Sequence, residues 1–106
     1  MSSARLGAYR LSPAALADLD DAWRYTAETW STDQADDYVD GLARAFDAIA
    51  NAPRMAREWT EFDPPVRIHV HRSHLIVYTQ RDDHIVVLRV LGGRQDWQSI
   101  LRALER

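Results

Sequence analysis

The sequence predicts an α+β fold in which an N-terminal strand and a helical hairpin pack on a largely antiparallel sheet, followed by a short C-terminal helix. Residues 66–94 are the most β-like part of the chain, since they are rich in Val, Ile, Tyr and Thr. Residues 13–30 and 32–51 carry apolar residues at helical spacing. A chain of 106 residues falls in the size range of one domain, so we expect residues 1–106 to form a single domain.

The first helix has a start signal directly after a short strand. Tyr9–Leu11 is an apolar-polar-apolar run, which predicts a strand that joins the sheet. Ser12 followed by Pro13 predicts a helix with Ser12 as its N-cap. Apolar residues then recur at helical spacing as far as Trp30, where we expect the helix to end. Trp23 and Trp30 lie on this apolar stripe, so we assign both to the core.

A second helix is expected immediately afterwards. Ser31 and Gln34 have the spacing of a capping box, and Pro53 disfavours helix in the residue before it. The short connection predicts an antiparallel hairpin, and the sheet is the only partner large enough to cover its apolar stripes. The acidic residues of both helices spread over exposed faces, which indicates a solvated surface and not a pair of catalytic carboxylates.

Three strands fit the β-rich region, and a helix should follow it. Residues 66–71 alternate between apolar and polar side chains, so one face of this strand should be apolar. Residues 75–80 and 85–91 are almost continuously apolar, which suits central strands covered on both faces. Residues 81–84 between them predict a polar hairpin turn. Residues 96–104 predict the last helix. The alternation of apolar and polar residues does not fix the order of the strands in the sheet.

The composition limits the class of protein. Cysteine is absent, which excludes a disulfide framework and thiolate chemistry. No window approaches the roughly 20 apolar residues of a membrane span, and the first residues lack the apolar core of a signal peptide. We therefore expect a cytoplasmic protein without a membrane partner. All 13 basic residues are Arg, but a GC-rich coding sequence gives the same bias, so this preference carries little weight.

Six residues are candidates for contact with a partner: Arg67, His69, His71, Arg89, Arg94 and Trp97. The arginines and histidines could converge on one concave face and hold a phosphate backbone or an acidic peptide. Arg89 has an alternative role as a strand arginine paired with an acid from the helices. Trp97 either anchors the last helix or offers an exposed aromatic ring to a partner.

The two neighbouring histidines also raise the possibility of a metal site. His69 and His71 should lie on the same side of a strand, about 7 Å apart. Such a pair can bind a metal ion, but no third ligand stands out nearby, although His74 and His84 lie on the adjoining hairpin. A solvated polar face is therefore the favoured interpretation, and we expect neither a metal nor a cofactor. No Gly-rich phosphate loop, nucleophile elbow or zinc-protease motif is present, so we assign no catalytic residue.

Five stretches in the same order resemble the ParE family of bacterial toxins, within the RelE/ParE superfamily. They are Tyr9–Ala15 with Asp18-Leu19, the Trp-Ser-x-x-Gln-Ala-x-x-Tyr run Trp30–Tyr38, Ala52–Arg54, Ser73–Tyr78 and Arg89–Asp96. One departure is Asp63–Val66 before Arg67, where the family tends to have a glycine and an aromatic residue.

The resemblance implies a RelE/ParE-like fold with a curved sheet, and it also implies a toxin of a type II toxin–antitoxin system. Such a toxin is paired with a ParD-like antitoxin, in a complex that could be a heterotetramer. It would reach DNA only through the DNA-binding part of the antitoxin. ParE-like toxins inhibit DNA gyrase, whereas the related RelE-like toxins cut mRNA on the ribosome.

The residues separate these two activities. Cleavage of RNA requires groups that activate the 2′-hydroxyl, orient the phosphate and protonate the leaving oxygen. Arg94 lies where a RelE-like nuclease has its phosphate-orienting arginine, but Ile100 occupies the position of the usual tyrosine, and Leu75 that of a basic residue. His69 or His71 could still act as a base. The pattern therefore predicts a toxin that inhibits gyrase by binding. The alternatives are a ribosome-dependent ribonuclease, or an inactive toxin-fold protein that persists in a repressor complex.

Overall fold

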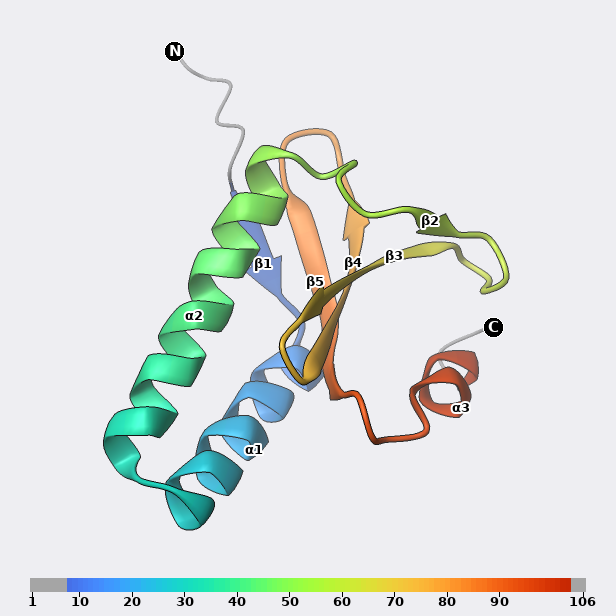
Figure 1. The fold of residues 1–106 in the computed structure, drawn as a ribbon. Coiled ribbons are helices and arrows are strands. Elements are labelled where there is room, and N and C mark those ends of the chain that lie inside the picture. Colours follow the sequence, from blue (N-terminus) through green and yellow to red (C-terminus); the bar gives the residue numbers. More distant parts are fainter. Residues whose placement is uncertain (1–7, 104–106) are drawn as a thin grey trace.

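The computed structural model describes residues 8–103 and consists of a helical hairpin, a five-stranded sheet and a short last helix (Figure 1). In chain order the elements are β1 (Tyr9–Leu11), α1 (Pro13–Thr29), α2 (Thr32–Asn51), β2 (Glu58–Trp59), β3 (Val66–His71), β4 (His74–Gln80), β5 (Ile85–Gly92) and α3 (Trp97–Arg102). The predicted α+β fold is confirmed. The predicted order of elements lacked only β2, which lies in the segment that we expected to be a connector. None of the described helices is both long and apolar enough to cross a bilayer.

The helices begin where the capping signals predicted. The Ser12 hydroxyl accepts a hydrogen bond from the Ala15 amide at 3.0 Å, and the Ser31 hydroxyl accepts one from the Gln34 amide at 3.0 Å. Each bond satisfies an amide at the start of a helix that would otherwise lack a partner, which contributes about 1 kcal/mol. Asp96 caps α3 in the same way, although its bond from the Ser99 amide is longer, at 3.4 Å.

The strands lie in the order β1-β5-β4-β3-β2. β1 runs parallel to β5, with Tyr9 opposite Ile85, and the other pairs are antiparallel. The pairing of β4 with β5 shifts register between Val77 and Tyr78. A bulge of this kind bends and twists the strand that carries it, and thereby favours a curved sheet.

Two apolar clusters cover the two faces of the sheet. On one face, the helical hairpin contributes Leu42, Phe46 and Ile49 to a cluster with residues of β4 and β5. On the other face, Leu101 of α3 packs with Val77 and with residues of the β2–β3 region. The central strands are therefore covered on both sides, as their continuous apolar runs predicted.

The core assignment of Trp30 was wrong, because 71% of this residue is exposed. Trp30 caps the C-terminus of α1, at the tip of the hairpin, and Figure 1 shows this tip extending away from the sheet. Helical spacing places Trp30 on the apolar stripe but does not show where the sheet beneath the stripe ends. Trp23 is half-buried, and its indole N–H donates to Asp36 at 2.8 Å.

Candidate functional site

The six candidate side chains lie in three separate regions. Arg67, His69 and His71 belong to β3, Arg89 to β5, and Arg94 and Trp97 to the segment that follows β5. The amide of Gly93, next to Arg94, donates to Ser73 in the β3–β4 turn at 2.7 Å. Arg67 lies near the other end of β3, roughly 15–20 Å from that turn by strand rise. The structure therefore does not bring the arginines together on one concave face.

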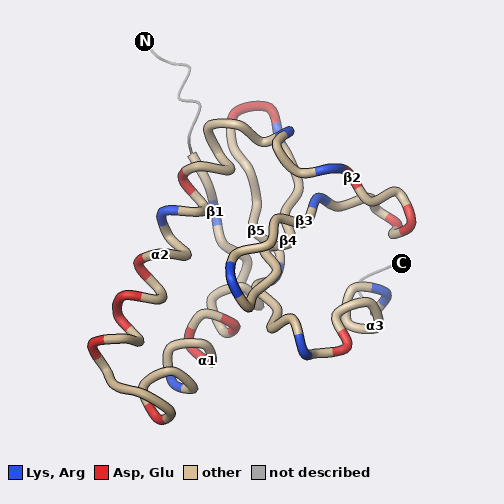
Figure 2. Tube along the Cα trace, in the orientation of Figure 1, with Lys and Arg blue, Asp and Glu red and all other residues tan. Residues whose placement is uncertain are grey.

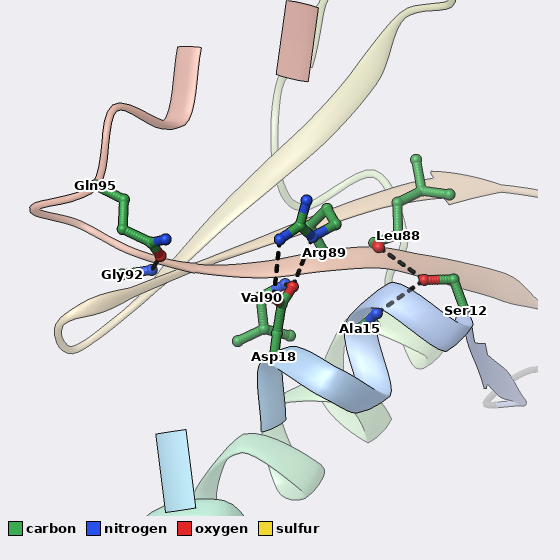
Figure 3. Close-up of polar contacts among 8 residues, drawn as sticks. All are labelled: Ser12, Ala15, Asp18, Leu88, Arg89, Val90, Gly92 and Gln95. Carbon is green, nitrogen blue, oxygen red and sulfur yellow. Dashed lines mark hydrogen bonds and ion pairs between the residues drawn. The ribbon is translucent and has the colours of Figure 1, made fainter. Parts of the chain in front are cut away.

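The outer edge of β5 is closed by side chains beyond the short strand β1 (Figure 3). β1 pairs with β5 only as far as Val87. Hydrogen bonds beyond that point join the Ser12 hydroxyl to the Leu88 carbonyl, Asp18 to the Val90 amide and Gln95 to the Gly92 amide, at 2.7, 2.8 and 2.7 Å. Because these backbone groups already have partners, this edge is a poor place to add another strand.

The Asp18 carboxylate that accepts from the Val90 amide also binds Arg89. Its Nε and one terminal nitrogen donate to the two oxygens of Asp18, at 2.7 and 2.9 Å. The side chains are only 21% and 11% exposed, so the pair is largely shielded from water. The hydrogen bond to Asp18 raises the pKa of Arg89 above its usual value. This geometry matches the alternative in which Arg89 pairs with an acid from the helices, and it gives Arg89 a structural role.

The histidines of β3 face the layer of helices. An added Cβ at Gly41 of α2 would lie 3.5 Å from His71 Nε2, which shows how closely the imidazole packs on that helix. Tyr38 of α2 lies between two imidazoles, with ring centroids 5.9 Å from His71 and 5.3 Å from His74. Its hydroxyl shares a 2.6 Å hydrogen bond with His74 Nδ1. The polar face of β3 is therefore only partly solvated. This corrects the interpretation that His69 and His71 lie on a solvated polar face.

A hollow of about 840 Å³ opens between this β3–β4 turn and the tip of the helical hairpin. Its polar and aromatic lining includes Tyr25, Trp30, Tyr38, Arg44, His71, Arg72 and His74. Tyr25 and Trp30 are 68% and 71% exposed, so the aromatic rings on its helical side are open to solvent. Aromatic rings beside cationic groups suit contact with another macromolecule.

Burial lowers the pKa of the three imidazoles in this region. It is the largest cause for His69, His71 and His74. The positive charges of Arg72 and Arg44, together with His69, lower the pKa of His71 further. For His74, the lowering by His71 is opposed by Asp18, which raises the pKa. These imidazoles are therefore mainly neutral at pH 7. Within residues 8–103, no three His, Asp or Glu side chains are placed to hold a metal ion.

The residues after β5 have different environments. Arg94 is exposed in the turn, whereas Trp97 is half-buried at the start of α3. The Trp97 ring lies edge-on to Trp59, with centroids 5.5 Å apart, and 6.3 Å from Phe62. Trp97 thus anchors α3 to the body of the protein, in agreement with the first of its two alternatives.

Sequence reasoning missed two contributors to these sites. Asp18 falls between Ala15 and Ala22 on the buried side of α1, three and four residues away, and a lone carboxylate on that stripe is the signal that could have identified it. His74 was considered only as a neighbour of the His69 and His71 pair, and was not among the six candidates. Its position directly opposite His71 follows from the pairing of β3 with β4.

The chain resembles known proteins over most of its length. Residues 9–97 match a family model described as the ParE toxin of type II toxin-antitoxin system, parDE. Toxin ParE1 of Mycobacterium tuberculosis is 38% identical over 89 residues, which cover 83% of this chain and 91% of the relative. Toxin ParE1 of Caulobacter vibrioides is 35% identical over 83 residues, which cover 78% and 85%.

The fold also has a counterpart among solved structures. A chain from a structure described as the chromosomal ParDE TA system from P. aeruginosa superimposes with a TM-score of 0.70. The match covers 83% of this chain and 97% of that chain, at 16% sequence identity. At that identity the likeness establishes a shared fold alone.

Proposed function

The chain belongs to the ParE family of toxins from type II toxin–antitoxin systems, and on that basis we propose that it inhibits DNA gyrase by binding and is neutralised by a ParD-like antitoxin. The observation that carries this proposal is the family match over residues 9–97, together with two relatives that are named as toxins. Gyrase acts on DNA in the cytoplasm, so we place the toxin there as well.

The dispersal of the candidate residues supports binding over catalysis. Cleavage of a phosphodiester requires a base, an acid and a phosphate clamp within hydrogen-bond reach of one reacting group. Arg89 is held by Asp18, and Arg67 and Arg94 lie toward opposite ends of the sheet. Ile100 is half-buried where a RelE-like nuclease has its tyrosine. An inhibitor that occupies its target needs none of this convergence.

The open edge of β3 supports a site for the antitoxin. β2 pairs only with Val66 and Arg67, so residues 68–71 have no strand on their outer side among the described residues. Val70 in this stretch is 64% exposed. A strand from the antitoxin could pair with these backbone groups, and apolar side chains beside it would cover Val70. The antitoxin would also supply the only contact with DNA, and a heterotetramer is one arrangement of the complex that fits the family resemblance.

An assay of DNA supercoiling tests the proposed target. The purified chain should inhibit supercoiling by gyrase, and addition of the antitoxin encoded beside it should restore the activity. Relaxation of DNA by a type I topoisomerase serves as the control and should be unaffected. Normal supercoiling in the presence of an excess of toxin that arrests growth when expressed would contradict gyrase as the target.

The hollow at the β3–β4 turn favours one alternative, a ribosome-dependent ribonuclease. It contains neutral imidazoles, the Tyr38 hydroxyl and two arginines, which are groups that can move protons and hold a phosphate. If the toxin acts by binding to gyrase, the double variant His69→Ala, His71→Ala should remain nearly as toxic as the parent. Cleaved mRNA in ribosome-bound samples, abolished by Arg94→Ala, would instead establish the nuclease.

A further inference from the structure

A second hollow, of about 500 Å³, lies beside β2, the start of β3 and the end of β4, and three arginines line it. Arg54 comes from the turn after α2, Arg67 from β3, and Arg81 from the turn between β4 and β5. Figure 2 shows blue positions near β2 and β3 and at one side of the β4–β5 turn, which is otherwise red, and it shows red positions recurring along α2. The fold thus gathers cations from three segments at one place, in a chain whose net charge is −3.

The positive charge of this hollow is not neutralised by ion pairs. Glu58 and Asp82 also line it, but within residues 8–103 neither carboxylate lies within 4 Å of a guanidinium nitrogen of the three arginines. Arg89 differs, because its guanidinium meets Asp18 at 2.7 Å. Three arginines against two acids leave a local excess of positive charge, and a bound anion would reduce their mutual repulsion.

The backbone beside the hollow holds one of these arginines in place. A terminal nitrogen of Arg67 donates to the Ala56 carbonyl at 2.6 Å, and the guanidinium retains further N–H donors for a ligand. Pro64 and Pro65 form part of the wall, and their rings restrict the backbone there. Thr79 borders the hollow as well, and its hydroxyl is buried without a hydrogen-bond partner in the described part of the chain. A polar group left unpaired in this way is uncommon in a folded protein.

We propose that this hollow is a binding site for a phosphate group, carried either by a phosphate monoester or by a phosphodiester. A guanidinium forms paired hydrogen bonds with phosphate oxygens in its plane. A phosphate has enough oxygens to contact more than one arginine, whereas a single carboxylate is satisfied by one guanidinium fork. The site is separate from the β3 edge that we assign to the antitoxin, and the proposal does not depend on the identity of the toxin's target.

Titration of the isotopically labelled chain with phosphate, followed by amide NMR at constant ionic strength, tests this site. Sodium phosphate should shift the amides of residues 79–82 saturably, whereas sodium chloride should not. Arg81→Gln should weaken the binding at least tenfold, since a charge-assisted hydrogen bond and its charge are lost. Glu58→Gln should strengthen it roughly threefold by removing a nearby negative charge, a gain that unfolding cannot produce.

A control variant and two further ligands make the test specific. Arg57→Gln removes a neighbouring arginine that lies over the Trp59 ring and does not line the hollow, so it should leave phosphate binding unchanged. A 5′-mononucleotide carries a phosphate monoester, whereas a single-stranded hexanucleotide without terminal phosphates carries only phosphodiesters. Tighter binding of one of these ligands than of the other supports the site and shows which ester it binds. Absence of saturable shifts with all three ligands, or equal losses in the Arg81 and Arg57 variants, would overturn it.

Discussion

Two strands of the sheet have neighbours too short to cover them. Side chains cover the remaining edge of one strand, whereas the remaining edge of the other is open. β1 covers only the start of β5, and β2 covers only the start of β3. Side chains of Ser12, Asp18 and Gln95 occupy the remaining edge of β5. Nothing in the described residues pairs with the outer edge of β3 from residue 68 onward. An unpaired edge is a risk of aggregation unless a partner covers it, and this difference is the reason why we propose the edge of β3 as the site for a partner strand.

The largest expected effect comes from opening the closed edge. Asp18→Ala removes the partner of both Arg89 and the Val90 amide, and leaves a shielded charge uncompensated. We expect the free energy of unfolding to fall by about 3 kcal/mol, measured by urea denaturation. Asp20→Ala is the matched control, since Asp20 forms an exposed pair with Arg24, and it should cost less than about 1 kcal/mol. Equal losses in both variants would show that the β5 edge has no special role.

A comparison of the two helix caps isolates one contact of the closed edge. Ser12 caps α1 and also donates to the Leu88 carbonyl, whereas Ser31 caps α2 alone. Ser12→Ala should therefore lower the free energy of unfolding by about 2 kcal/mol, and Ser31→Ala by about 1 kcal/mol. Thermal and urea unfolding measure both values. A Ser31 variant as unstable as the Ser12 variant would remove the evidence for a stabilising contact across the edge.

The open edge should affect binding rather than stability. Val70→Lys places a charge on an exposed position of β3, as natural edge strands do to prevent pairing. We expect the affinity for the antitoxin to fall about tenfold, with the free energy of unfolding changed by less than about 0.5 kcal/mol. Leu16→Lys, on the 54% exposed Leu16 of α1, is the control and should not alter the affinity. Calorimetric titration measures the affinity, and equal effects of the two lysines would argue against the edge.

The smallest expected effect is a dependence of stability on pH that arises from the histidines of β3 and β4. The pKa of His69, His71 and His74 is lowered by folding, so the unfolded chain binds more protons as the pH falls below about 6.5. Stability should therefore decline modestly from pH 7 to pH 5. The double variant His71→Gln, His74→Gln should flatten this decline, as measured by urea denaturation at each pH. An unchanged slope would show that these imidazoles titrate alike in both states.

Local signals in the sequence predicted most of the elements. The caps at Ser12 and Ser31 and the end of α2 before Pro53 depend on residues a few positions apart, so they could be identified without the fold. β2 has only two residues, which are too few to show an alternation of apolar and polar side chains. The order of the strands was also beyond prediction, because alternation identifies the faces of a strand but not its neighbours.

The candidate site was less predictable, because its contacts join distant parts of the chain. Asp18 and Arg89 are 71 residues apart, and only the parallel placement of β1 beside β5 brings α1 over Arg89. The hollow that contains Arg67 also depends on three separate segments. Trp30 was misassigned for a related reason, since helical spacing carries no information about the length of the sheet that the helix covers.

Hydrogen exchange of the free toxin and of its complex with the antitoxin tests the contrast between the two edges most directly. In the free chain the amides of Val90 and Gly92 should already exchange slowly, because side chains accept their hydrogen bonds. On binding of the antitoxin, outward-facing amides among residues 68–71 should become protected, while those of Val90 and Gly92 change little. New protection along β5, with none along β3, would contradict the account.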